Sequence, residues 1–388
     1  MKTTYENNTL TLHLEGRIDS NNASSVEHEI MDAMAAAQGA EIVLDAEKLE
    51  YISSAGLRVL MKLRKQVGKA LTVLNVSPEV YDIFEVTGFT ELLDVKKRLR
   101  EINVEGCGLI GKGGNGAVYR LDPETIVKVY YGVSNPLEKI QRDREVSRAV
   151  FVQGINTAIP YDVVKVGDDY GVVFEMVEAD TLGRFLAKHP DRLEEYTHKM
   201  TLLLKQLHST EFEPGKLPDA RNIIYHRINI SEEKGLFTPN ELGIMRSFTD
   251  SIPSRCTFVH GDFHPGNIMV KDDGLILIDV GDSGVGHPIN DFMGMYLMYV
   301  VAANAGSSEM YCGLDGESLG RMWPQILREY FETDDPEPYA QAIAGVATLK
   351  LLLGIAVNPN IPDERRLPAI TSVKSSFFDN VDKLVIVP

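Results

Sequence analysis

The sequence predicts an α/β domain followed by an α+β domain of two lobes, the first lobe built on an antiparallel sheet and the second mainly helical. Strand-like and helix-like patterns alternate over residues 9–88. A glycine-rich segment, residues 111–116, lies between two strand-like runs, and the chain is mostly helical in pattern from residue 292 onward. We expect one domain at residues 1–98 and a second at 103–388, with lobes at 103–177 and 178–388.

The net charge of −17 is unevenly distributed, because residues 1–100 hold 12 basic and 15 acidic residues and the rest of the chain holds 27 and 41. Nucleic acid is disfavoured as a partner, since its phosphates require a basic face. An acidic second domain is compatible with a cationic substrate such as an aminosugar or an amino alcohol. It is equally compatible with a role of the charge in solubility alone.

The cysteines are three in number and lack the spacing of a metal site, which suits the reducing cytoplasm. The start of the chain has no apolar signal core. The most apolar later runs are 292–303, which is too short to span a bilayer, and 342–357, which is interrupted by Lys350. We expect both runs to be buried helices and the protein to be cytoplasmic, without a membrane partner.

The first domain is expected to alternate strands and helices. Strands are predicted where apolar residues alternate or form a short run, and helices where they recur every three or four positions. The predicted strands are 9–18, 42–44 and 71–76, and the predicted helices are 21–38, 56–67 and one from Ser77 to near Gly88.

Residues 44–60 contain Leu-Asp and then Tyr-Ile-Ser-Ser-Ala-Gly-Leu-Arg-Val-Leu. This pattern resembles the STAS family of anti-anti-sigma factors, over nearly the whole of residues 3–97. The resemblance implies an anti-sigma factor as partner and a phosphorylated serine at the start of a helix. Alignment on Gly56 and Leu57 places that serine at Ser54, while the aspartate of the family pattern falls on Ser53.

Two roles fit the serines at this helix start. A phosphate on Ser54 would meet free backbone N–H groups and the positive end of the helix dipole. Alternatively, Ser53 or Ser54 is simply a helix N-cap, which is the commonest role for serine at such a position.

The glycine-rich segment at 111–116 has the pattern G-x-G-x-x-G. In a dinucleotide-binding fold this pattern should open a helix, but here a turn and the strand-like run 125–131 follow. We therefore expect a β-hairpin that covers nucleotide phosphates, with Lys128 contacting the α- and β-phosphates. The glycines expected to let the backbone approach the phosphates are Gly111, Gly113 and Gly116.

A charged helix is predicted from Ser134 to about Val150, because a cap residue and a proline at its first turn open it. Glu138 and Glu145 share one face of this helix, and Glu145 is the one expected to pair with Lys128. The strand-like runs 158–166 and 170–173 follow, and residues 174–177 then connect the two lobes.

The segment 260–282 has the residue types that phosphoryl transfer needs. It reads H-G-D-F-H-P-G-N, then two apolar strands around an acidic turn, then I-D-V-G-D. In this reaction a carboxylate accepts the proton of the attacking hydroxyl, while an Asn side chain and a second carboxylate hold the magnesium ions that bridge the nucleotide phosphates. The spacing predicts Asp262 as the base and Asn267 and Asp279 as metal ligands.

Residues 103–388 resemble the aminoglycoside phosphotransferase and choline kinase branch of the protein-kinase-like fold. The resemblance is carried by H-G-D-x-H-x-x-N at 260–267, I-D-x-x-D at 278–282 and G-x-P-x-x-D at 286–291. It implies ATP and magnesium as cofactors and binding of adenine by backbone groups of Glu175 and Val177. It also implies that the carboxyl-terminal lobe carries the substrate pocket.

Three functions are compatible with the sequence. In the first, the protein phosphorylates a hydroxyl of a small molecule; Gly261 and Val280 favour this, because they stand where protein kinases have the arginine of H-R-D and the phenylalanine of D-F-G. In the second, the kinase domain phosphorylates the serine of its own or another STAS domain. In the third, the protein is a nucleotide-sensing module whose output is binding of an anti-sigma partner.

Overall fold

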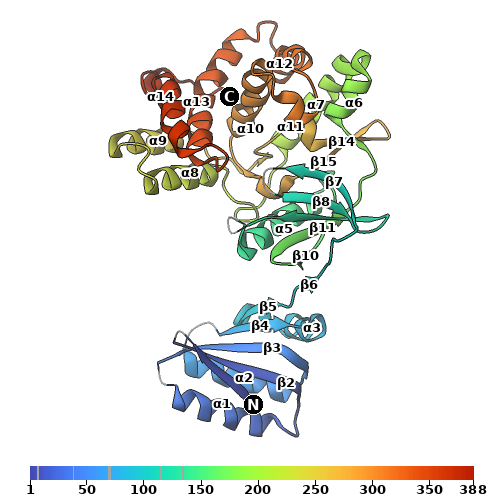
Figure 1. Ribbon diagram of the computed structural model, residues 1–388, viewed down its shortest axis with the longest axis vertical. Coiled ribbons are helices and arrows are strands. Elements are labelled where there is room, and N and C mark those ends of the chain that lie inside the picture. The colour runs from blue at the N-terminus through green and yellow to red at the C-terminus, as the bar shows by residue number, and fades with distance from the viewer. Residues whose placement is uncertain (7, 38, 69–70, 114–115, 133–134) are drawn as a thin grey trace. The chain divides into compact units, whose positions relative to one another are not determined.

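The computed structural model describes residues 1–388 except 7, 38, 69–70, 114–115 and 133–134. The chain forms two compact units, Met1–Ile102 and Asn103–Pro388. Figure 1 shows the elements of each unit.

The first unit is a five-stranded sheet in the order β1-β2-β3-β4-β5, packed with helices. β1 and β2 are antiparallel, and the remaining neighbours are parallel. Its strands are β1 (Lys2–Glu6), β2 (Thr9–Ile18), β3 (Glu41–Ile52), β4 (Thr72–Val76) and β5 (Asp94–Lys97), followed by the two-residue strand β6 (Arg100–Glu101). Its helices are α1 (Ala23–Ala36), α2 (Ser54–Val67), α3 (Pro78–Val86) and α4 (Phe89–Leu92).

The three strands and three helices predicted for this unit are all present. Two strands of the sheet, β1 and β5, and the short elements α4 and β6 are additional to the prediction. All five residues of β1 are exposed, and β5 has no fully buried residue. Neither strand therefore has the apolar pattern from which a buried strand can be predicted.

Helix α2 begins two residues earlier than predicted, because Ser53 is its N-cap. The side chain of Ser53 accepts a hydrogen bond from the backbone N–H of Ala55 at 3.2 Å. Apolar side chains that recur every three residues, Leu57, Leu60 and Leu63, are buried in the core of the unit. These contacts fix the start of α2 against the sheet and make Ser54 its first residue.

The second unit begins with an antiparallel sheet whose strands lie in the order β10-β11-β9-β8-β7. The β-hairpin predicted at the glycine-rich segment is present as β7 and β8. The elements of this lobe are β7 (Gly108–Gly113), β8 (Gly116–Arg120), β9 (Thr125–Tyr130), α5 (Leu137–Val152), β10 (Pro160–Val166) and β11 (Asp169–Glu175).

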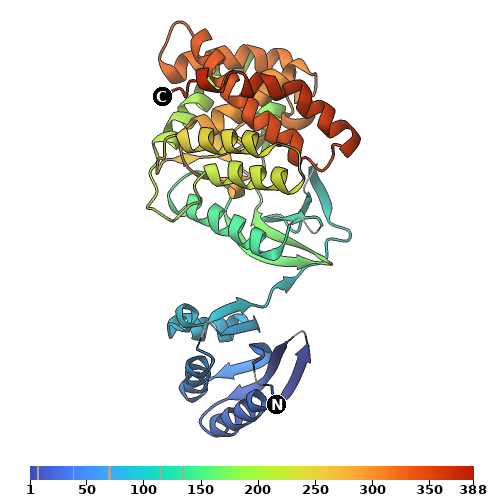
Figure 2. The same cartoon turned by 90° about the vertical axis from the view of Figure 1, so that its left-hand side faces the viewer.

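The rest of the unit is the predicted helical lobe, which Figure 2 shows stacked on the sheet lobe. Its helices are α6 (Leu182–Lys188), α7 (Leu193–Ser209), α8 (Arg221–Glu233), α9 (Pro239–Ser251), α10 (Ile289–Tyr296), α11 (Ser308–Cys312), α12 (Gly316–Phe331), α13 (Glu337–Val357) and α14 (Asp363–Phe378). Its short strands are β12 (Asp180–Thr181), β13 (Phe258–Val259), β14 (Ile268–Lys271), β15 (Gly274–Leu277) and β16 (Gly284–Val285). A π-helical segment, Leu297–Ala302, continues α10.

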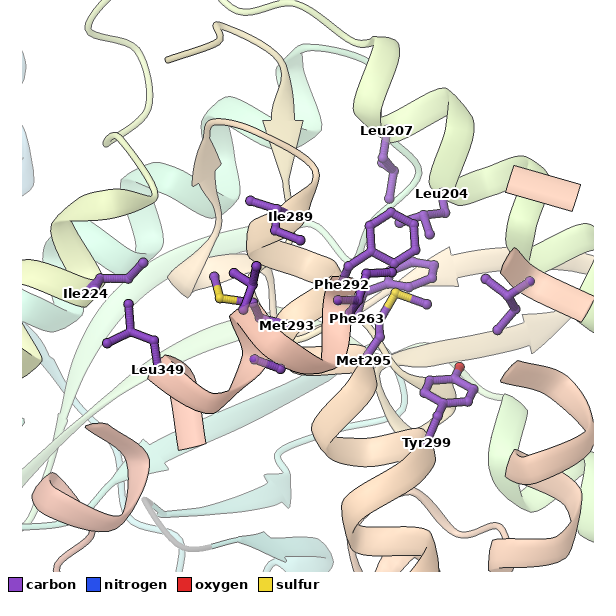
Figure 3. Packing of buried hydrophobic residues seen from close by; sticks show 14 of the residues in the cluster. Leu204, Leu207, Ile224, Phe263, Ile289, Phe292, Met293, Met295, Tyr299 and Leu349 are labelled. Atoms are coloured by element: carbon purple, nitrogen blue, oxygen red, sulfur yellow. The ribbon is translucent and has the colours of Figure 1, made fainter. Parts of the chain in front are cut away.

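The core of this lobe forms around α10 and the π-helical segment that continues it, where Phe292, Met295 and Tyr299 belong to the same buried cluster as Leu204 and Leu207 of α7 (Figure 3). The methionine-rich run after residue 292 is thus part of the core, as predicted.

Among the described residues, one helix, α13, is long and apolar enough by length and composition to cross a membrane. This helix also contributes Ile343, Val346 and Leu349 to the core, which agrees with the buried helix predicted at 342–357.

The cap of α2 leads to a prediction that separates the two serines. Ser53→Ala removes the acceptor of the Ala55 N–H, so we expect it to lower the free energy of unfolding of the first unit by about 1 kcal/mol. Ser54→Ala, whose side chain is exposed, should change it by less than about 0.5 kcal/mol. Hydrogen exchange of the α2 amides measures both changes, and equal losses in the two variants would contradict the assignment of the cap.

Candidate active site

A buried carboxylate, that of Asp291, holds the loop formed by residues 260–267. It accepts hydrogen bonds from the backbone N–H groups of His260 at 2.9 Å and Gly261 at 2.5 Å, and it lies 3.0 Å from Nε2 of His208. Burial alone would raise the pKa of Asp291, but the hydrogen bond and charge of His208, together with His260, hold it below its ordinary value. One ionised side chain thus fixes the path of the 260–267 loop.

This loop brings Asp262 and Asn267 together. Nδ2 of Asn267 donates to the backbone oxygen of Asp262 at 2.9 Å and lies 3.3 Å from Oδ2 of the same residue. Although desolvation opposes it, the hydrogen bond and charge of His264, with the charges of Lys350 and His260, hold the pKa of Asp262 well below its usual range. The carboxylate of Asp262 is therefore ionised at neutral pH, and its side chain remains 67% exposed.

Lys128 in β9 and Asp279 after β15 form an ion pair with 2.5 Å between Nζ and Oδ1. Burial works against the charge, but the carboxylate of Asp279 raises the pKa of Lys128 above its ordinary value, with further contributions from Tyr130 and Asp282. Asp279 has a φ of +60°, a left-handed conformation that is uncommon for a residue other than glycine and typical of functional sites. The structure thus brings two of the predicted site residues into direct contact.

The predicted pairing of Glu145 with Lys128 is wrong. The Glu145 carboxylate accepts a hydrogen bond from Arg144 at 2.6 Å, and its side chain is 61% exposed. Asp143 is the acidic residue of α5 that is buried and lines the same pocket as Lys128. Two positions along a helix rotate a side chain by about 200°, so distance along the chain could not decide which acidic residue faces the lysine.

Three carboxylates that line the pocket, those of Asp143, Asp282 and Glu309, were not among the predicted site residues. Burial raises the pKa of Asp143 to about 6, and the charge of Asp282 contributes. Asp282 itself is the last residue of the I-D-x-x-D pattern, a signal that could have pointed to it. Asp143 belongs to no pattern, and only its burial in the folded unit identifies it.

The three predicted glycines lie on the β7–β8 hairpin and line the pocket. A Cβ atom at Gly116 would lie 1.9 Å from the carbonyl oxygen of Val129, whereas one at Gly111 or Gly113 would meet nothing within 4 Å. Gly116 is therefore required by the close approach of the neighbouring strand, and the other two leave space over the pocket. The tip of the hairpin, residues 114–115, and the predicted helix cap Ser134 lie outside the described residues.

The connection between the lobes begins at Glu175, the last residue of β11. The backbone N–H groups of Glu175 and Met176 donate to Ile159 and Glu124 at 3.0 and 2.7 Å. In the described part of the chain, the N–H of Val177 has no acceptor within the protein. This N–H is therefore available to a ligand at the edge of the pocket.

A pocket of about 660 Å³ lies between the two lobes. Lys128, Asn267 and Asp279 line it, as do the predicted glycines, Glu175 and Val177, whereas Asp262 and Glu145 do not belong to its lining. Within the described chain, no group of three or more His, Cys, Asp and Glu side chains is arranged to hold a metal ion unaided.

Ser54, in the first unit, is exposed at the start of α2. Its neighbour Ser53 has the capping role, and the Ser54 hydroxyl makes no hydrogen bond to any residue that the structure describes. The capping role thus belongs to Ser53, and phosphorylation of Ser54 stays a prediction.

Comparisons with known proteins divide the chain at the same place. A family model described as the phosphotransferase enzyme family matches residues 108–326, and a model of the STAS domain matches residues 1–102.

Similar proteins are found for each part. The chain is 35% identical over 85 residues to BtrV of Bordetella bronchiseptica, which is provisionally named an anti-sigma factor antagonist. This match covers 21% of this chain and 72% of that protein. It is 26% identical over 94 residues to the anti-sigma-B factor antagonist of Bacillus subtilis, covering 24% and 84%. A solved structure of aminoglycoside phosphotransferase APH(2'')-Ib with ADP bound is similar at 18% identity and a TM-score of 0.47, covering 69% of this chain and 92% of that chain.

The buried carboxylate of Asp143 leads to a pH-dependent prediction. Its pKa of about 6 in the folded protein exceeds the value of about 3.9 in an unfolded chain, so its ionisation above pH 6 destabilises the fold. We expect Asp143→Asn to raise the free energy of unfolding by about 1–2 kcal/mol at pH 8, with the gain shrinking as the pH falls from 6 towards 4.

Thermal denaturation at pH 8 and pH 5 measures this gain. Glu145→Gln is the matched control, because it removes an exposed carboxylate from the same helix and should change the stability by less than about 0.5 kcal/mol. A less stable Asp143→Asn at pH 8 would mean that the charge of Asp143 is fully compensated in the fold.

Proposed function

Because the chain belongs to the phosphotransferase enzyme family, we propose that its second unit transfers the γ-phosphoryl group of ATP to a hydroxyl group of a small molecule. The observation that carries this proposal is the pairing of an ionised, reachable Asp262 with Asn267, on a loop beside the pocket that contains Lys128 and Asp279. The STAS domain is the regulatory part of the chain.

Asp262 is the general base of this reaction. Its ionised carboxylate accepts the proton of the attacking hydroxyl as the new bond to phosphorus forms. The hydrogen bond from Asn267 and the nearby His264 fix the orientation of the carboxylate before the acceptor arrives. Positioning of this kind supplies a large part of the catalysis in phosphoryl transfer, where the protein does little covalent chemistry.

The residues present fit a magnesium site that is completed by nucleotide phosphates. Mg²⁺ is usually held by one or two carboxylates, further oxygen ligands and substrate phosphates. Asn267 uses its Nδ2 in the 260–267 loop, which leaves its amide oxygen free, and Asp279 uses one of its two oxygens for Lys128. Asn267 and Asp279 would hold the metal, which would neutralise the charge of the phosphates.

The remaining pocket residues bind the nucleotide. Lys128 contacts the α- and β-phosphates, and Asp143 takes the place that Glu145 was expected to fill beside it. Gly111, Gly113 and Gly116 cover the phosphates, and the N–H of Val177 with the carbonyl of Glu175 binds the adenine edge. The free N–H of Val177 supports this assignment.

The base leads to the most direct test of the proposal. Asp262→Asn preserves the shape of the side chain but cannot accept the proton, so we expect the rate of transfer to fall by about 10²–10⁴-fold while ATP still binds. A coupled assay of ADP release and a calorimetric titration with ATP measure the two quantities.

Asp272→Asn is the matched control, because Asp272 lies on the exposed turn between β14 and β15. This variant should keep the activity of the original protein. Full turnover by Asp262→Asn would show that Asp262 is not the base.

A second candidate function is supported by the exposed hydroxyl of Ser54. A phosphate there would meet the N-terminal end of α2, and the related proteins BtrV and the anti-sigma-B factor antagonist are named as antagonists of anti-sigma factors. In this candidate the second unit phosphorylates Ser54 and thereby controls binding of an anti-sigma partner to the STAS domain.

This candidate predicts that the purified chain gains one phosphate on incubation with ATP and Mg²⁺. Intact-mass spectrometry should detect the gain in the original protein and in Ser53→Ala, but in neither Ser54→Ala nor Asp262→Asn. An unchanged mass of the original protein would exclude its own kinase unit as the source of the phosphate.

A further inference from the structure

Two cationic side chains from the helical lobe lie close to Asp262. Lys350 of α13 donates a hydrogen bond from Nζ to the carbonyl oxygen of Gly261 at 2.9 Å, so its ammonium group lies beside the residue that precedes Asp262. A Cβ atom at Gly294 would lie 2.7 Å from this Nζ. The missing side chain at Gly294 therefore leaves the space that the ammonium group occupies.

Arg227 of α8 is the second cation. It lies one turn after Ile224, which belongs to the same core cluster as Leu349 of α13 (Figure 3). Its charge acts on Lys350 and lowers the pKa of that lysine, although burial has the larger effect. Arg227 also interacts with Asp262 and Asp282 through their charges. The two helices thus bring both cations to the side of the lobe where Asp262 lies.

Neither cation has an ion-pair partner within the described part of the chain, although the charges of Asp262 and Asp282 act on Arg227 and those of Asp262 and Asp291 act on Lys350. The guanidinium group of Arg227 makes no hydrogen bond and no ion pair there. Its nitrogen atoms also remain accessible to solvent. Among the described residues, Nε of Arg64 is the only fully buried side-chain nitrogen or oxygen atom without a hydrogen-bond partner, so no nitrogen atom of the Arg227 guanidinium group is fully buried. Lys350 uses one of its three donors on Gly261, which leaves two.

The acidic residues of these helices lie elsewhere. In α8 they are Glu232 and Glu233 at the carboxyl-terminal end, and Glu232 pairs with Arg246. In α13 the acidic residue is Glu337 in the first turn, about 20 Å from Lys350 along the helix. A cationic acceptor would therefore meet two like charges from α8 and α13, and the carboxylates near these cations are those of Asp262, Asp282 and Asp291 from other segments.

A purely structural role does not account for both residues. A single neutral donor would satisfy the carbonyl oxygen of Gly261, and holding two positive charges close together in a partly buried place is unfavourable. An anionic group placed between them would remove this repulsion and accept charge-assisted hydrogen bonds from both.

We propose that the acceptor is a small alcohol with a negatively charged oxygen group, a carboxylate or a phosphate, which Arg227 and Lys350 bind while its hydroxyl lies against Asp262. This inference rests on the proposed function. In the reaction the hydroxyl oxygen bonds to the γ-phosphorus as the bond between that phosphorus and the β–γ bridging oxygen breaks. ADP leaves with the electron pair, and the hydroxyl proton passes to Asp262.

The test uses the full chain and four acceptors with the same three-carbon skeleton: glycerol, glycerate, glycerol 3-phosphate and 3-amino-1,2-propanediol. ADP release is measured with each, and product formation is checked by mass spectrometry. We expect kcat/KM for at least one anionic acceptor to exceed that for the cationic one by about 10-fold or more, as a charge-assisted hydrogen bond implies.

Variants of Arg227 test whether this side chain causes the preference for anionic acceptors. Arg227→Gln should raise KM for the anionic acceptor by about 10-fold or more and leave KM for ATP unchanged, and Arg227→Lys should restore part of the loss. Arg221→Gln is the matched control, because Arg221 is on the same helix but already pairs with Asp219. Equal melting temperatures would show that the variants are folded.

Two results would overturn the inference while the proposed function stands. One is preferred transfer to 3-amino-1,2-propanediol, and the other is a preference for anions that Arg227→Gln does not alter. Transfer to none of the four acceptors, with ATP hydrolysis that still depends on Asp262, would also overturn it. ATP turnover that Asp262→Asn leaves unchanged would instead overturn the proposed function.

Discussion

The carboxylate of Asp291 is the constraint on which the geometry of the site depends. It is buried at the start of α10 and receives the backbone of the 260–267 loop together with His208 of α7. His208 continues the network to Tyr330 of α12, with 2.8 Å between Nδ1 and the phenol oxygen. A buried charge is costly unless its hydrogen bonds are complete, so α7, α10, α12 and the loop are held in one arrangement.

Much of this architecture could be predicted from local patterns. The strands and helices with a buried apolar face, such as β2 and α2, follow from the spacing of their side chains. The 260–267 loop and Asp279 follow from the spacing of polar residues, because residues at neighbouring strand ends meet in space. Strands with few buried residues, such as β1, leave no such pattern.

Residues that act across the fold could not be predicted in this way. Asp143 and Glu145 are both acidic residues of α5, and only the rotation of the helix on the sheet distinguishes them. The role of Asp291 depends on three partners from distant segments, although its G-x-P-x-x-D pattern is visible in the sequence. The overall acidity of the second unit likewise gives no hint of Arg227 and Lys350, because net charge says nothing about its local distribution.

The ion pair between Lys128 and Asp279 has a consequence for how the pocket fills. The carboxylates of Asp143, Asp279 and Asp282 all act on this one lysine. A polyanion that enters alone is repelled by them, whereas one that arrives with a divalent cation is not. Under the proposed function, occupancy by nucleotide and by cation would therefore be thermodynamically linked, and each would raise the affinity of the other by the same factor. The concentration of free divalent cation would then determine what fraction of the protein has nucleotide bound.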